Sequence, residues 1–167
     1  MARLVMKFGG TSVADIERIK EVARRVQSEV DAGNQVAVVV SAMAGTTDQL
    51  VRWARDLCKM PDPSEYDVVV STGEQITSGL LTLALQDRGL HARSWLAWQL
   101  PVKTSASHMS ARIEKVEVSE IEASLIRGMV AVVPGFQGVS VESRITTLGR
   151  GGSDTSAVAL AAALNAD

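Results

Sequence analysis

The sequence predicts an α/β fold in which a mainly parallel β-sheet is sandwiched between helices. Strand-like and helix-like segments alternate along the chain, and two strand-like segments, 35–41 and 129–134, are almost uninterrupted apolar runs. Such runs are typical of parallel strands buried on both faces. Turns of small residues follow three strand-like segments, at 9–12, 41–47 and 149–154. Because open α/β sheets bind ligands beyond the carboxyl ends of their strands, these turns are the candidate binding elements.

The amino-terminal part of the chain predicts a β-α-β unit. The short apolar stretch 4–7 is expected to be a strand that ends in a glycine turn. Apolar residues then recur every three or four positions between residues 16 and 30, which is typical of an amphipathic helix. Asp15 is placed to cap the start of this helix and Gly33 to end it, before the buried strand at 35–41.

A second helix is expected at 48–59, and it should stop before the rigid loop Pro61-Asp62-Pro63. The next stretch carries two different signals. The β-branched run 68–70 favours a strand, whereas residues 74–88 are typical of a helix. Propensity therefore predicts a change from strand to helix within this segment.

The second half of the chain predicts shorter elements. A helix is expected at 118–127, ended by Gly128, and another at 155–164. The last helix consists almost entirely of Ala, Leu and Val, so it should be buried. Short strands are expected at 92–96, 101–104, 113–117, 129–134 and 144–148.

The composition is that of one soluble globular domain. The 167 residues are 46% hydrophobic and 22% charged, which suffices for a sizeable core. The net charge of −2 lacks the positive excess that drives binding to nucleic acids. No apolar run approaches the roughly 20 residues of a membrane helix, and no export signal is recognisable. A single cysteine fits a reducing compartment, so we expect a cytoplasmic protein that binds neither nucleic acids nor membranes.

Several conspicuous side chains are expected to be structural. Cys58 should be a small buried residue, and the three tryptophans should pack in the core. His91 and His108 are too few for a metal pair or a catalytic triad. No metal site formed by the protein itself is therefore expected.

The turn Lys7-Phe8-Gly9-Gly10-Thr11-Ser12 combines a cation, two glycines and two hydroxyls at the entry to a helix. Exposed backbone amides and the helix dipole favour an anion there, and Lys7 can neutralise its charge. These features suit a phosphate group. An ordinary turn with a solvent-reaching lysine is the alternative, because neither GxxxxGK[ST] nor GxGxxG occurs.

The turn Gly149-Arg150-Gly151-Gly152-Ser153-Asp154 combines a guanidinium group suited to a carboxylate with glycines, a hydroxyl and an acid, just before a helix. This density of functional groups predicts a site for a polar ligand. The alternative is a flexible glycine loop in which Asp154 only caps the helix that follows.

Two further segments have both a functional and a structural interpretation. Glu74 stands at a helix start, where it can pair with an ammonium group of a ligand or simply complement the helix dipole. The turn from Ser41 to Thr47 can bring its hydroxyls to a ligand, or it can be a plain turn that caps the next helix.

Taken together, five segments resemble the aspartate kinases of the amino-acid kinase family, in order and with matching spacing. They are KFGGTS at 7–12, VVVSAMAGTTDQL at 38–50, STGEQIT at 71–77, PGFQG at 134–138 and TTLGRGGSDTSAVALAAAL at 146–164. The resemblance implies a carbamate kinase-like α/β fold. It also implies ATP-dependent phosphorylation of the side-chain carboxylate of L-aspartate, the entry step to lysine, threonine and methionine synthesis.

Position by position, the resemblance implies two groups of site residues. Those that bind ATP would be Lys7, Phe8, Gly9, Gly10, Ser12 and Ser41. Those that bind the acceptor would be Thr47, Glu74, Arg150, Gly151, Gly152, Ser153 and Asp154. Lys7 and Asp154 would be catalytic, Lys7 by stabilising the transferred phosphoryl group and Asp154 by organising Lys7 and the donor. Glu74 would meet the aspartate ammonium group and Arg150 its α-carboxylate. Mg²⁺ would be carried on ATP.

The resemblance also sets the expected extent of the domain. The family's kinase domain continues beyond residue 167 into a nucleotide-binding part, commonly followed by regulatory ACT domains. Residues 1–167 are therefore expected to be the amino-terminal, substrate-binding part of a C-terminally incomplete domain, inactive alone and compatible with a homo-oligomer. The resemblance implies a helix at 66–71, against the propensity, and it assigns no roles within 109–124.

Two alternatives remain open at this point. The same fold can phosphorylate another acceptor, such as glutamate or UMP, although an ammonium site at Glu74 with a carboxylate site at Arg150 favours an amino acid. The chain can also be a binding module that senses an amino acid without turnover. All these interpretations require the turns that begin at Lys7, Ser41 and Gly149 to meet at one pocket.

Overall fold

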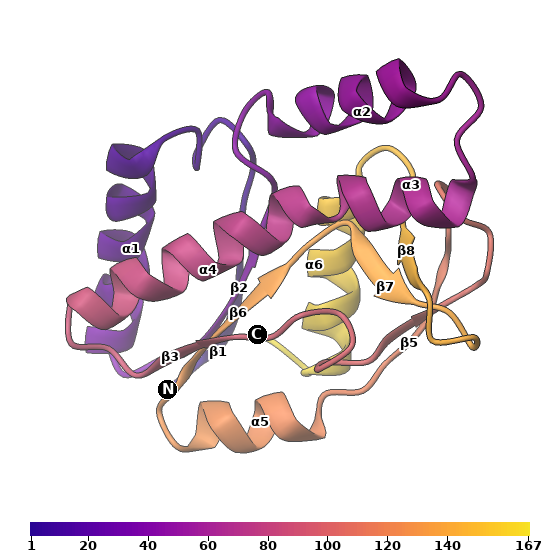
Figure 1. Ribbon diagram of the computed structural model, residues 1–167. Coiled ribbons are helices and arrows are strands. Elements are labelled where there is room, and N and C mark those ends of the chain that lie inside the picture. Colours follow the sequence, from indigo (N-terminus) through magenta and orange to yellow (C-terminus); the bar gives the residue numbers. More distant parts are fainter.

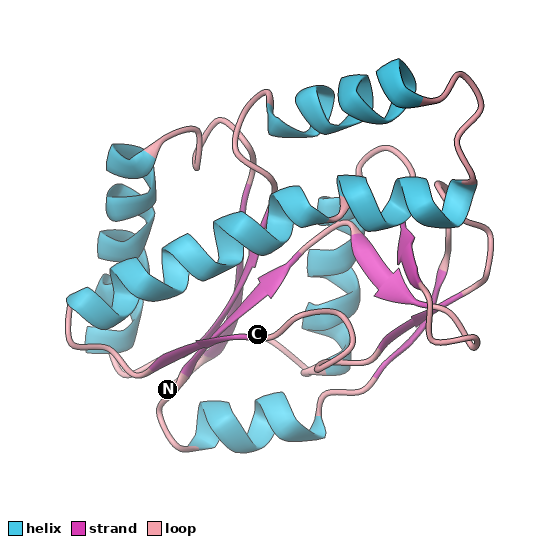
Figure 2. Cartoon of the chain, in the orientation of Figure 1, coloured by secondary structure: helices cyan, strands magenta, loops and turns pink.

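A four-stranded parallel sheet forms the centre of the protein, with helices on both faces (Figures 1 and 2). The computed structural model describes residues 1–167. The strand order is β1-β2-β6-β3 and every pair is parallel, as the sequence predicts. The strands are β1 (Arg3–Phe8), β2 (Gln35–Val40), β6 (Val130–Pro134) and β3 (Ala92–Ser94).

Both faces of the sheet are buried, because successive residues of its central strands enter different cores. Val36, Val38 and Val40 of β2 pack in one core, whereas Ala37 and Val39 pack in the other. This arrangement explains why β2 is an uninterrupted apolar run. The first core is covered by α1 (Ile16–Asp31) and α4 (Thr72–Asp87), and the second by α5 (Ser119–Ile126) and α6 (Gly152–Ala163).

A second, mixed sheet lies beside the first, and the sequence did not predict it as a separate unit. Its order is β5-β4-β7-β8, and only the β4–β7 pair is parallel. The strands are β5 (Ile113–Val116), β4 (Val102–Thr104), β7 (Gln137–Val139) and β8 (Ile145–Thr147). Strand β7 escaped prediction because it has only three residues, one of them Gly138. A Cβ on Gly138 would lie 2.6 Å from the carbonyl oxygen of Val102, so this pairing requires glycine.

The strand predicted at 68–70 is wrong, and the helix implied by the resemblance is present. Residues 63–70 form α3 (Pro63–Val70), which follows α2 (Thr46–Leu57). The side chain of Asp62 accepts hydrogen bonds from the N–H groups of Ser64 and Glu65, and Pro63 occupies the first helical position. An N-cap followed by proline starts a helix strongly enough to override the β-propensity of the valines.

Helices α3 and α4 follow each other directly and form a long helical stretch that contains many apolar residues. Residues Pro63–Asp87 span 25 residues, and one 18-residue window within them has a mean hydropathy of 1.3, so by length and composition alone this stretch could cross a membrane. Half of that window is buried inside the fold, and Leu81 and Leu85 of α4 belong to the first core. Core helices of soluble proteins meet the same criterion, and packing explains the apolar residues here.

The predicted limits of α1 are confirmed, whereas those of α6 differ. Asp15 accepts a hydrogen bond from the N–H of Arg18, and Gly33 adopts a φ of 85° after the helix. Helix α6 begins three residues earlier than predicted, with Gly151 as its N-cap, so Asp154 lies in the first turn and does not cap it. The helix is also only partly buried, because the side chain of Val158 is 70% exposed.

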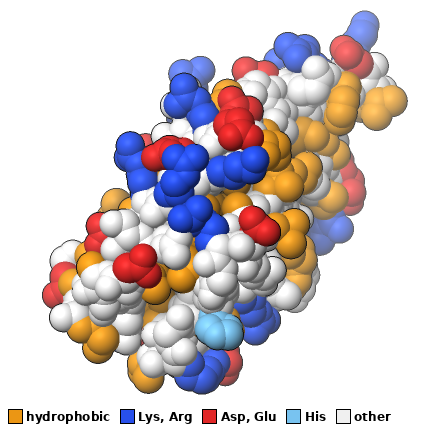
Figure 3. All heavy atoms as spheres, turned by 90° about the vertical axis from the view of Figure 1, so that its left-hand side faces the viewer, with side chains coloured by type: hydrophobic (Ala, Val, Ile, Leu, Met, Phe, Trp, Pro, Cys, Tyr) orange, Lys and Arg blue, Asp and Glu red, His pale blue; other side chains and the backbone are white.

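Several side chains expected in the core lie at the surface. Cys58 is exposed, and Trp53 and Trp98 are 56% and 53% exposed, whereas Trp95 is buried as predicted. On the face that carries α1, basic and acidic side chains are interspersed with apolar ones (Figure 3). Lys20 pairs with Glu17 one helical turn away, so positive charge on this face is partly balanced within the helix itself.

Candidate functional site

The carboxyl ends of β1, β2 and β6 meet at one edge of the parallel sheet. Their last residues, Phe8, Val40 and Pro134, occupy one row of the strand register. The backbone continues this row, since the N–H of Ser41 donates to the Phe8 carbonyl at 3.0 Å and the N–H of Gly135 donates to the Val40 carbonyl at 2.9 Å. The turns that follow the three strands therefore lie next to one another.

The glycine-rich turn before α6 lies at the same edge of the sheet, because its neighbouring residues contact Phe136 in the turn after β6. The N–H of Leu148 donates to the Phe136 carbonyl at 2.8 Å, and the N–H of Phe136 donates to Ser156 Oγ at 3.0 Å. A Cβ on Gly152 would lie only 2.8 Å from Cδ2 of Phe136. Glycine at this position therefore lets the start of α6 approach the turn after β6.

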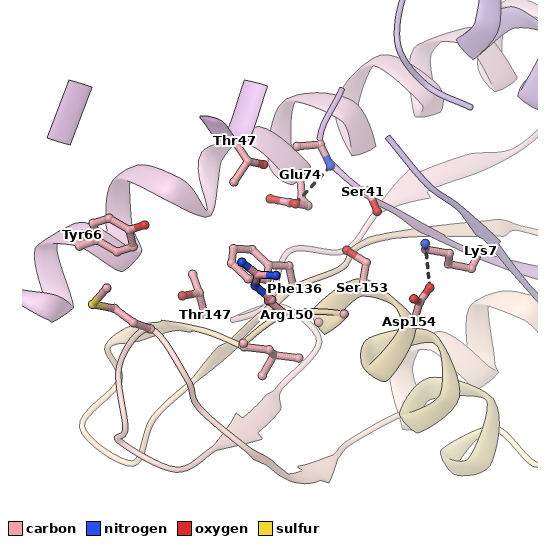
Figure 4. A pocket seen from close by; sticks show the side chains of 16 residues that line it. Lys7, Ser41, Thr47, Tyr66, Glu74, Phe136, Thr147, Arg150, Ser153 and Asp154 are labelled. Carbon is pink, nitrogen blue, oxygen red and sulfur yellow. Dashed lines mark hydrogen bonds and ion pairs between the residues drawn. The ribbon is translucent and has the colours of Figure 1, made fainter. Parts of the chain in front are cut away.

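These segments surround one cavity of about 420 Å³ (Figure 4). The sequence-predicted residues that line it are Lys7, Ser41, Thr47, Glu74, Arg150, Gly151, Gly152, Ser153 and Asp154. The segments that begin at Lys7, Ser41 and Gly149 thus reach a single pocket, although the first does so only through Lys7. Figure 4 places Lys7 and Asp154 at one end of this pocket and Tyr66 at the other.

Four predicted residues of the first turn do not line this cavity: Phe8, Gly9, Gly10 and Ser12. The side chain of Phe8 is 8% exposed and packs in the first core. A Cβ on Gly10 would lie 2.9 Å from the carbonyl oxygen of Ala42, so this glycine serves close packing of two turns. Ser12 instead lines a smaller cavity of about 100 Å³ beside α1.

Lys7 and Asp154 form an ion pair at one end of the cavity. The distance between Lys7 Nζ and Asp154 Oδ1 is 2.7 Å, and the two side chains are 29% and 71% exposed. Lys7 comes from the end of β1 and Asp154 from the first turn of α6. A pair this exposed adds little to stability, about 0 to 1 kcal/mol, and both groups remain accessible from solvent.

Glu74 is the buried charged group of the cavity. It lies in the first turn of α4, is 4% exposed, and its Oε2 atom is buried without a hydrogen-bond partner. Burial disfavours the charged form and raises the pKa of Glu74 from 4.5 to about 7, although hydrogen bonds from the backbone of Glu74 and Ala42 act in the opposite direction. A cationic ligand group at Oε2 would satisfy this oxygen.

Arg150 provides the opposite charge. Its guanidinium group makes no ion pair within the chain, and the residue is exposed. The left-handed backbone of Gly151, with a φ of 74°, turns the chain between Arg150 and α6. The cavity therefore offers a carboxylate oxygen and a guanidinium group that both lack partners, which together suit a zwitterion.

Further lining residues were not predicted as site residues: Tyr66, Ala42, Met109, Phe136, Thr147, Leu148 and Gly149. Phe136 belongs to the PGFQG segment, and its φ of 71° is unusual for a bulky residue. This segment was the sequence feature from which Phe136 could have been predicted as a site residue. Thr147, Leu148 and Gly149 likewise belong to the segment 146–164 that carries the resemblance. Met109 lies outside the five segments and is held by a long-range hydrogen bond from its N–H to Asp67, so no local pattern marks it.

The comparisons with known proteins agree with this geometry. The amino acid kinase family model matches residues 2–167. An aspartate kinase of Pseudomonas putida is 53% identical over all 167 residues, and aspartokinase 2 of Bacillus subtilis is 48% identical over the whole chain. The chain spans only 41% of the length of each of these relatives.

Solved structures give the same result. The aspartate kinase from Synechocystis superposes with a TM-score of 0.86 at 45% identity, over 99% of this chain and 27% of that one. Aspartokinase III of E. coli, solved in complex with aspartate and ADP, superposes with a TM-score of 0.84 at 26% identity, over 99% of this chain and 47% of that one. With a family match over nearly every residue, this chain belongs to the amino acid kinase family.

Proposed function

We propose that this chain is the amino-acid-binding part of an aspartate kinase, which transfers the γ-phosphoryl group of ATP to the side-chain carboxylate of L-aspartate. The observation that carries the proposal is the buried, unpartnered Oε2 of Glu74 in a cavity that Arg150 also lines. Glu74 would bind the ammonium group of the acceptor and Arg150 its α-carboxylate, which leaves the side-chain carboxylate free to react. The product, 4-phospho-L-aspartate, would open the aspartate pathway to lysine, threonine and methionine in the cytoplasm.

The Lys7 end of the cavity suits the phosphate groups of the donor. Lys7 Nζ is a cation at the carboxyl end of β1, close to the amino terminus of α6, whose dipole favours an anion. Asp154 would hold Lys7 in place until the nucleotide arrives. Ser41 and Ser153 line the same cavity and provide hydroxyl donors. When bound on the nucleotide, Mg²⁺ supplies positive charge to the β- and γ-phosphates.

The reaction requires positioning more than acid–base chemistry. A carboxylate oxygen of aspartate forms a bond to the γ-phosphorus while the bond from that phosphorus to the β,γ-bridging oxygen breaks, and ADP leaves with the bonding electrons. The attacking carboxylate is already ionised at neutral pH, so no general base is needed. Lys7 would stabilise the negative charge on the phosphoryl oxygens during transfer.

The test is the formation of acyl phosphate, trapped with hydroxylamine as aspartyl hydroxamate, by a chain of the relatives' full length that carries residues 1–167. We propose that residues 1–167 alone are inactive, because they span 41% of the length of those relatives. Product is expected only with ATP, Mg²⁺ and aspartate, and Lys7→Ala and Asp154→Ala should each abolish it. Normal hydroxamate formation by both variants would refute the assignment of the site.

A panel of acceptors separates the remaining candidates. Phosphorylation of glutamate or UMP in place of aspartate would keep the fold and change the substrate. Calorimetric binding of aspartate without any turnover, by the same full-length chain, would instead indicate a sensing module. The pairing of the unpartnered carboxylate oxygen of Glu74 with the guanidinium group of Arg150 favours an amino acid over UMP.

A further inference from the structure

Asp67, which none of the preceding roles uses, is a fully buried carboxylate at the far end of the cavity. It lies in α3 with 0% exposure. Its Oδ1 accepts from Thr147 Oγ1 at 2.6 Å, and its Oδ2 accepts from the N–H of Thr147 at 3.1 Å and from His108 Nδ1 at 2.7 Å. Both oxygens also accept from the N–H of Met109 at 3.1 Å. Each of these contacts is with a group that can donate a hydrogen bond to a carboxylate oxygen.

The groups that Asp67 holds form one wall of the pocket. Met109 and Thr147 line the cavity, as does Tyr66, the residue before Asp67. Figure 4 shows Tyr66 and Thr147 away from the Lys7–Asp154 end. Asp67 itself does not line the cavity. It therefore joins its own segment to two others, 41 and 80 residues further along the chain, whose side chains would face the acceptor.

Met109 gives independent support for a constrained wall. Its φ of 66° lies in the left-handed region, which is unfavourable for a residue with a side chain. Such a conformation persists only when the surroundings enforce it, and here the Met109 N–H is bound by both oxygens of the Asp67 carboxylate. His108, whose side chain is 14% exposed, contacts the Asp67 carboxylate, whose own side chain is fully buried.

We propose that Asp67 and His108 are positioning residues that set the affinity for the acceptor by fixing the wall formed by Tyr66, Met109 and Thr147. The inference rests on the proposed function, because it assumes that the acceptor occupies this cavity. Since the wall lies away from Lys7, the pair should affect the acceptor and leave the nucleotide unaffected.

The experiment measures kcat and both KM values for a chain of the relatives' full length that carries these residues. His108→Leu removes the hydrogen bond between the imidazole ring and Asp67 and should raise the KM for aspartate about tenfold, with kcat and the KM for ATP changed less than about twofold. His108→Asn, whose side-chain amide can take the place of Nδ1–H, should restore the KM for aspartate to within about twofold of the parent.

A second position controls for loosening of the fold. Arg144, the residue before β8, binds α3 through Ser64 Oγ at 3.0 Å and through Glu65, yet it does not line the cavity. Arg144→Ala should lower the melting temperature without changing the KM for aspartate. Asp67→Asn should accelerate hydrogen exchange at the backbone amides of Met109 and Thr147. If Asp67→Asn does not fold, the exchange rate of the Met109 amide is measured in His108→Leu instead, where it should also increase.

The outcomes separate the two claims. Equal increases of both KM values in His108→Leu, or a lower melting temperature with unchanged kinetics, would overturn the positioning role while the proposed function stands. A parent protein that phosphorylates no amino acid would refute the proposed function, and with it this inference.

Discussion

The Oε1 atom of Glu74 accepts a hydrogen bond from the backbone N–H of Ala42 at 3.2 Å, and this bond joins the start of α4 to the turn after β2. The residue before Glu74, Gly73, lies so close to Ala42 that a Cβ on it would be 2.8 Å from the Ala42 Cβ. One turn of helix and one turn of the sheet edge are thus packed without space between them. This contact holds the second carboxylate oxygen, Oε2, in the cavity without a partner.

Glu74 should make the stability of the protein depend on pH. Its pKa is about 7 in the fold against 4.5 in the unfolded chain, so the folded state binds more protons between these values. The free energy of unfolding should therefore fall as pH rises from 4.5 to about 7, by on the order of 3 kcal/mol from this group, and stay level above. Glu74→Gln should lack this contribution, and urea titrations of both proteins across the range measure the difference. If the unfolding free energies of the parent and of Glu74→Gln differ by the same amount at every pH, the carboxyl group of Glu74 is not buried as described.

Binding of the acceptor should release protons from Glu74 near neutral pH. An ammonium group at Oε2 stabilises the ionised carboxylate, so at pH 7 about half a proton should leave per amino acid bound. Calorimetry in two buffers with different ionisation enthalpies measures this release. The affinity for aspartate should also rise between about pH 6 and pH 8, since the carboxylate is then already ionised. Proton uptake, or an affinity that falls over this range, would show that no cation meets Glu74.

Arg150 should recognise the α-carboxylate without contributing to stability. Because it is exposed and has no ion-pair partner in the chain, Arg150→Leu should leave the melting temperature nearly unchanged. The same substitution removes a guanidinium–carboxylate contact and should raise the KM for aspartate about tenfold to a hundredfold. The α-amide of aspartate serves as the matched ligand, since parent and variant should use it almost equally poorly. If the variant prefers aspartate over its α-amide by the same factor as the parent protein does, the α-carboxylate does not bind at Arg150.

Two glycines of α4 should respond to alanine with opposite signs. Gly73→Ala places a Cβ against Ala42 and should destabilise the protein by about 1 to 3 kcal/mol. Gly79 has nothing within 4 Å of its Cβ position, so Gly79→Ala should stabilise the helix by about 1 kcal/mol. Chemical denaturation of both variants measures the two changes. Equal effects at the two positions would mean that helix propensity alone governs both.

The errors in the sequence-based fold have a common physical cause. The valines at 68–70 have high β-propensity, but the Asp62 cap and Pro63 begin a helix that packs on β8. The mixed sheet depends on pairings such as that of Lys103 with Val139, between strands of three residues. Such short strands are stabilised by their neighbours more than by their own residues. Local patterns therefore underestimate both features.

The parallel sheet, the caps of α1 and the three turns of small residues could all be predicted from the amino-acid sequence, because apolar periodicity, capping and glycine act within a few neighbouring residues. The unpartnered oxygen of Glu74 and the hydrogen bond of Asp67 with Thr147, 80 residues away, could be recognised only from the three-dimensional fold. It also excluded Phe8, Gly9, Gly10 and Ser12 from the lining of that cavity. Burial and long-range hydrogen bonds depend on which segments meet in space, and that information is not contained in any local stretch of the chain.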